Sequence, residues 1–88
     1  MESKFIKKRN LTADKLKIGM EVLDSELDNI LDTYIILGDV KLVDISPIEK
    51  AYQGKIVAIS NKLIHPSKEG QTLVFNDSFS RQEYCHYE

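Results

Sequence analysis

The sequence predicts a mainly β domain of four or five short, mostly antiparallel strands with one or two short helical turns, arranged as a small barrel or sandwich. Runs of β-branched and aromatic residues recur along the chain, and the densest one covers residues 32–45. Turn-forming residues, including four glycines, separate these runs. The 88 residues are enough for one domain with a single modest core. We assign residues 11–88 to this domain and residues 1–10 to a basic N-terminal arm.

The first part of the chain contains two helix signals. The arm has no clean hydrophobic period, so we expect a frayed segment or a short strand at a sheet edge. Thr12 can accept a backbone hydrogen bond at the start of one helical turn, and a first strand follows at residues 20–23. The apolar residues at positions 27, 30 and 31 share one face of a second helical turn, which Ser25 is placed to cap.

The run at residues 32–45 is expected to be the central strand. Residues 34–37 are apolar without a break, as in a strand that is covered on both faces. After Gly38 and Asp39 the pattern alternates, which predicts Val40, Leu42 and Ile45 on the inner face. We therefore expect this strand to bend at Gly38.

The second half of the chain predicts two more strands and a docked tail. Pro47 ends the central strand, and residues 46–54 are expected to form a loop. In a strand at residues 55–60, alternation places Ile56 and Ala58 on one face and Val57 and Ile59 on the other. The loop of residues 61–71 should be pinned to the core by Leu63 and Ile64. A strand at residues 72–76 and a docked tail from residue 77 complete the domain.

Two segments of the chain carry a resemblance to known proteins. Residues 16–22 (LKIGMEV), a short turn followed by a glycine and a strand, look like the first strand region of SH3-like small barrels. Residues 54–59 (GKIVAI) resemble the glycine-led middle strand of that group. Residues 27–37, 75–78 and 85–88 together are similar to short bacterial proteins associated with mobile genetic elements. This resemblance implies an SH3-like barrel and transfers no active site.

Composition favours a cytoplasmic protein. Hydrophobic residues make up 42% and charged residues 30% of the chain, which is ordinary for a folded soluble domain. No apolar run has the length that a membrane span requires, so we expect no membrane partner. A single cysteine, Cys85, excludes an internal disulfide.

Neither a metal site nor a catalytic site is expected. Asp24, Glu26 and Asp28 have the alternation of a calcium loop, but Asn29 and Ile35 stand where that loop needs glycine and glutamate. Cys85 and His86 are adjacent, so on an extended chain they point to opposite faces. His65 would reach Cys85 only through a contact made by the fold. We predict a non-enzymatic protein without a cofactor.

The leading functional hypothesis is a protein-interaction or accessory module with an unidentified protein partner. Tyrosine combines apolar area with a hydrogen-bonding tip, and aromatic residues are enriched at protein interfaces. The tail supplies the candidate binding residues Phe79, Tyr84 and Tyr87.

Nucleic-acid binding through the arm is the alternative hypothesis. Residues 1–17 hold six basic and two acidic side chains, a net charge of +4, whereas residues 18–88 hold six basic and twelve acidic ones, a net charge of −6. Basic side chains can neutralise phosphates, and an aromatic ring can stack on a base, but the acidic remainder repels a polyanion. The candidate residues are Lys4, Phe5, Lys7, Lys8 and Arg9.

Overall fold

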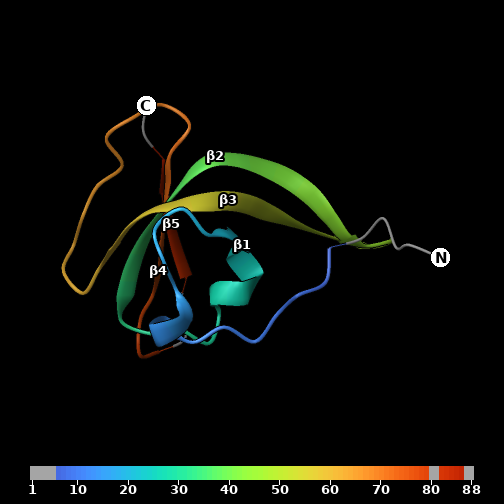
Figure 1. Ribbon diagram of the computed structural model, residues 1–88, viewed down its shortest axis with the longest axis horizontal. Coiled ribbons are helices and arrows are strands. Elements are labelled where there is room, and N and C mark those ends of the chain that lie inside the picture. Colours follow the sequence, from blue (N-terminus) through green and yellow to red (C-terminus); the bar gives the residue numbers. More distant parts are fainter. Residues whose placement is uncertain (1–5, 80–81, 87–88) are drawn as a thin grey trace.

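The protein folds as one five-stranded antiparallel sheet with two short 3-10 turns (Figure 1). The computed structural model describes residues 6–79 and 82–86, with residues 82 and 83 described by their backbone alone. The hydrogen-bonded order of the strands is β1-β3-β2-β4-β5. The predicted fold class, mainly β with short helical turns, is confirmed. The elements are η1 (Ala13–Lys15), β1 (Glu21–Leu23), η2 (Asp24–Leu27), β2 (Thr33–Ser46), β3 (Glu49–Ser60), β4 (Thr72–Asn76) and β5 (Gln82–His86).

β2 is the centre of the sheet, as its apolar run predicted. Its first half pairs with β3 on one side and with β4 on the other. Ile35 and Leu37 are buried in the core, while Tyr34 on the opposite face stacks on Phe75 of β4 with ring centroids 4.0 Å apart. A strand with neighbours on both sides and covered faces favours apolar residues, because little water reaches it. The prediction of a central strand through residues 33–45 is confirmed.

The core lies under the concave face of the curved sheet. β2 and β3 run side by side and arch over η1, η2 and the segment that precedes them (Figure 1). Apolar side chains from this underlying segment meet the inward-facing side chains of the strands. The buried cluster consists of Leu11, Leu16, Val22, Leu27, Ile30, Ile35, Leu37, Ile56 and Val74.

A β-bulge at Val57 changes which side chains of β3 face the core. Ile36 pairs with Ala58 but Leu37 pairs with Ile56, so Val57 is an extra residue without a partner on β2. A bulge shifts the alternation by one position. Ile59 therefore packs against the same core as Ile56. The prediction that Ile56 and Ile59 lie on opposite faces is wrong.

The predicted loop at residues 46–54 is also wrong, because β3 begins at Glu49. The chain turns through Pro47 and Ile48, and the register pairs Lys41–Ser46 with Glu49–Gln53. This part of the β2–β3 ribbon extends past the core, so its side chains are mostly exposed, and residues 49–53 carry no apolar alternation. For the same reason Leu42, which was expected inside, has 53% of its surface exposed.

Three local predictions are wrong: the cap at Thr12, the extent and cap of the second helical turn, and the packing of the loop of residues 61–71. The Thr12 hydroxyl donates to the Asp14 carboxylate and does not cap η1. η2 ends at Leu27, earlier than expected. The side chain that accepts a backbone N–H at its start, that of Leu23, belongs to Glu26 and not to Ser25. In the loop of residues 61–71 Leu63 is exposed, and Pro66 is the buried residue.

The described part of the arm lies against the domain. The Ile6 N–H donates to the carbonyl oxygen of Asp44 over 3.4 Å, which places the arm beside the outer half of β2. No helix within the described residues is long and apolar enough to cross a membrane.

Candidate binding groove

A pocket of about 230 Å³ opens on the concave side of the sheet. Its walls come from η2 and from all the strands except β1, so it exists only once the sheet has curved. A second hollow of about 250 Å³ continues from it toward Gly70 and Gln71 and shares four of its lining residues. We call the two together the concave groove. The first pocket is lined by Asp24, Leu37, Val40, Tyr52, Thr72, Val74, Tyr84 and His86.

Asp24 joins three elements at one end of this groove. One of its carboxylate oxygens accepts the backbone N–H of Tyr52 on β3 over 3.2 Å. The other accepts the hydroxyl of Tyr84 on β5 over 3.0 Å. Burial, followed by the negative charges of Asp24 and Asp28, raises the pKa of the Tyr84 phenol. The phenol therefore stays protonated and donates to Asp24 at any physiological pH.

Apolar side chains form the floor of the groove. Leu37 and Val74 are buried, and Val40 is half-buried against the core. Tyr52 is 47% exposed beside them and stands directly opposite Leu42 in the register of β2 and β3. Directly opposite residues of an antiparallel pair face the same side, so the apolar surface continues from the groove along the ribbon.

The other wall of the groove carries hydrogen-bonding groups. Thr72 Oγ1 lies 3.0 Å from His86 Nδ1, which joins β4 to β5. Cys85 pairs with Leu73 and, as the neighbour of His86 on a strand, points to the other face of the sheet. The thiol and the imidazole therefore do not face each other.

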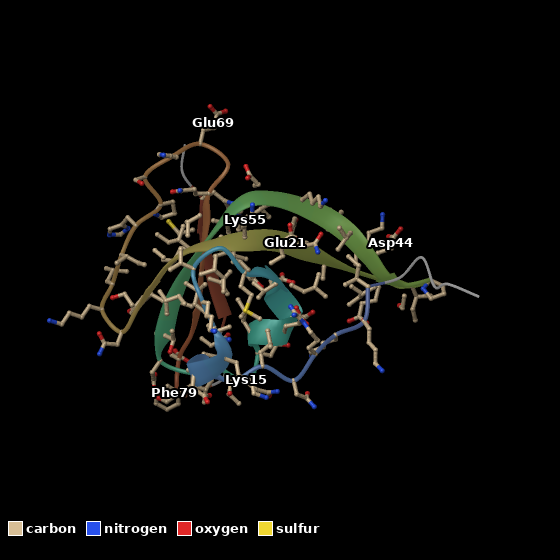
Figure 2. The ribbon with its side chains drawn as sticks, viewed as in Figure 1. Lys15, Glu21, Asp44, Lys55, Glu69 and Phe79 are labelled. Atoms are coloured by element: carbon tan, nitrogen blue, oxygen red, sulfur yellow. The ribbon has the colours of Figure 1, made fainter. Side chains whose placement is uncertain are left out.

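The three predicted protein-binding residues have different positions. Tyr84 lines the groove and is 41% exposed. Phe79 is 89% exposed in the turn between β4 and β5, at the end of the molecule away from Asp44 and the tip of the ribbon (Figure 2). Phe79 does not line the groove. Tyr87 lies outside the described residues.

Sequence reasoning missed Asp24, Val40 and Tyr52 as groove residues. Tyr52 stood in the segment expected to be a loop, and Asp24 was considered only as a calcium ligand. The three residues belong to different elements, and no local pattern indicates that the chain brings them together.

Arg9 of the basic arm is hydrogen-bonded to the domain, although half of its side chain is exposed. Its Nε donates to Glu26 Oε2 over 2.7 Å, its backbone N–H donates to the same oxygen over 2.7 Å, and its Nη2 donates to the Glu21 carbonyl over 2.8 Å. Glu26 is 2% exposed and also accepts the Leu23 N–H. Burial raises the pKa of the Glu26 carboxyl, but the hydrogen bonds and charge of Arg9 and the Leu23 N–H outweigh it and hold that pKa below its ordinary value.

The other candidate nucleic-acid residues are divided between the described and the undescribed parts of the arm. Lys8 Nζ lies 3.7 Å from an Asp28 carboxylate oxygen. Lys7 is exposed. Lys4 and Phe5 lie outside the described residues. Arg9 and Lys8 thus face acidic side chains of the domain, and the nucleic-acid hypothesis stays a prediction.

Within residues 6–79 and 82–86, no group of three or more histidine, cysteine, aspartate or glutamate side chains is arranged to hold a metal ion. Comparison of the chain with models of known families, with curated proteins and with solved structures gave no match. The concave groove is therefore interpreted from its own chemistry.

Proposed function

We propose that the protein is a non-enzymatic interaction module that binds a segment of a partner protein in the concave groove. The observation that carries this proposal is the convergence of Tyr52, Tyr84 and Val40, from three strands, around one partly open apolar surface. Exposed tyrosines beside an apolar floor are typical of protein-binding surfaces, because the ring buries area and the hydroxyl still finds a partner.

The division of the groove into two hollows suits the side chains of a peptide. Pockets that enclose drug-sized ligands are usually about 300–1,000 Å³. Each hollow taken alone is smaller, and the two adjoin, because they share four lining residues. Such a shape suits consecutive anchoring side chains of an extended peptide. β5, which supplies Tyr84 and His86, is at the edge of the sheet, where an extended segment can add to the backbone.

Site-specific photo-crosslinking tests this proposal. p-Benzoylphenylalanine replacing Tyr52 should capture a protein in cells, and the same residue replacing Val57 should not. Val57 is a matched control because it is similarly exposed on the same strand but does not line the groove. Equal capture at both positions, or no protein captured at position 52, would contradict the proposal.

Two other outcomes would replace the proposal with another function. Capture of nucleic acid, weakened by added salt and by Lys7→Ala with Lys8→Ala, would favour the alternative hypothesis. Arg9 is left unchanged in this test because its loss also disturbs the domain. Turnover of a small molecule that is lost in Cys85→Ala or His65→Ala would show an enzyme.

A further inference from the structure

The charge around the concave groove indicates what kind of side chain it accepts. Among the residues that line its two hollows, Asp24 is the acidic one, and none is lysine or arginine. The apolar groove therefore has a negative end, formed where η2 meets β3 and β5.

Asp24 keeps hydrogen-bonding capacity in this arrangement. Each of its two oxygens accepts one hydrogen bond, from the Tyr52 N–H and from the Tyr84 hydroxyl. A carboxylate oxygen has about two acceptor positions, so a further donor can approach each oxygen. Because both bonds come from the protein itself, the carboxylate is held in place before any ligand arrives, which reduces the entropy lost on binding.

Two tyrosines line the same pocket as this carboxylate. Tyr52 and Tyr84 both line the pocket, and both are partly exposed. The face of an aromatic ring attracts a cation, and the attraction adds to that of a neighbouring carboxylate. The apolar floor of Leu37, Val40 and Val74 fits the methylene stem of a long basic side chain, which buries its carbons and keeps its charged end near polar groups.

We propose that the groove recognises a basic side chain, arginine or lysine, of a partner peptide, with Asp24 as its counter-ion and the rings of Tyr52 and Tyr84 beside the cation. This inference rests on the proposed peptide-binding function and specifies the chemistry of the partner. An acidic peptide is disfavoured by the same charges that attract a basic one.

The experiment uses five capped pentapeptides, Ac-Val-Thr-X-Thr-Val-NH₂, in which X is arginine, citrulline, lysine, norleucine or glutamate. Citrulline has nearly the shape of arginine without its charge. Norleucine keeps the four-carbon stem of lysine without its ammonium group. Each peptide is titrated into the ¹⁵N-labelled full chain, and the amide shifts of residues 24, 52 and 84 are followed by NMR. We expect arginine and lysine to bind about three- to tenfold more tightly than their neutral counterparts, with glutamate the weakest.

Two variants of the protein locate the effect. Asp24→Asn removes the charge and keeps an acceptor oxygen, and it should bring the arginine peptide to the affinity of the citrulline peptide. Asp39→Asn makes the same chemical change outside the groove, at a positive-φ position that asparagine tolerates, and should leave the difference intact. Raising NaCl from about 50 to 500 mM should weaken the arginine peptide more than the norleucine peptide.

The outcomes separate this inference from the proposed function. Equal binding of charged and neutral peptides in the groove would overturn the basic-side-chain inference and leave peptide binding standing. Groove amides that respond to none of the five peptides would overturn the inference and count against peptide binding as well. The comparison of arginine with citrulline uses the unaltered protein, so it decides the question even where Asp24→Asn lowers stability.

Discussion

Glu26 is a buried carboxylate whose role is to hold the arm against the domain. It accepts hydrogen bonds from the Arg9 side chain and from the backbone N–H groups of Arg9 and Leu23. These bonds keep its pKa in the folded protein below the ordinary value of 4.5. A carboxyl whose pKa is lowered by folding stabilises the folded state above its unfolded pKa, and this contribution is lost as pH falls toward the folded pKa.

We therefore expect the free energy of unfolding to be constant near neutral pH and to decrease as pH falls below about 4.5. Glu26→Gln should lower the stability at pH 7 by about 1–3 kcal/mol and flatten this decrease. Urea unfolding at several pH values measures both effects. Asp14→Asn is the control, because that carboxyl is exposed although its pKa is also lowered, chiefly by the Thr12 hydroxyl. An acid decrease unchanged in Glu26→Gln would show that another group causes it.

At the scale of elements, β2 packs tightly against β3 at Gly54. A methyl group added there would lie 2.8 Å from Leu37 Cβ and 3.1 Å from Val40 Cγ2. Leu37 Cβ is fixed to the backbone of the central strand and cannot move aside without moving β2. Leu37 and Val40, the two side chains that Gly54 approaches, also line the concave groove.

Gly54→Ala should therefore lower the free energy of unfolding by about 1–3 kcal/mol. Gly38→Ala is the matched comparison: its methyl group would lie 3.1 Å from Cγ1 of Val57, an exposed side chain that can change rotamer. We expect a smaller loss there. Thermal or urea unfolding of both variants measures the difference. A loss in Gly38→Ala equal to or larger than that in Gly54→Ala would contradict this account of the close packing at Gly54.

The curved sheet and the exposed ribbon differ at the scale of the whole molecule. Residues 35–37 of β2 are buried and pair with strands on both sides. Residues 41–46 pair with β3 in a ribbon whose side chains mostly face water, with the Ile6 N–H donating to Asp44 on the other side. Figure 1 shows this ribbon reaching away from the rest of the sheet. Backbone hydrogen bonds open more easily where little apolar area is buried around them.

Hydrogen exchange should therefore separate the two halves of β2. We expect the amides of residues 35–37 to exchange at least about a hundredfold more slowly than those of residues 42, 43, 50 and 52. Exchange followed by NMR at neutral pH resolves single amides. Uniform protection along β2 and β3 would show that the ribbon and the body of the sheet open as one unit.

The sequence by itself determined the class of this fold and the identity of its central strand. Residues 33–46 and 72–76 are rich in residues that fit a pleated surface, and this preference acts locally, so both strands are readable from the chain. The same local reasoning failed at Val57 and at residues 49–53. A bulge and a solvent-exposed ribbon depend on what the neighbouring strand does, which the local pattern does not contain.

The tertiary structure alone decided the groove. Asp24 lies 28 positions before Tyr52 and 60 positions before Tyr84, yet it hydrogen-bonds to both. No spacing rule joins residues at such separations, because their meeting follows from the curvature of the sheet and from the path of the chain through η2. Local preferences fix which segments are strands, whereas packing of the curved sheet fixes which side chains surround a common surface.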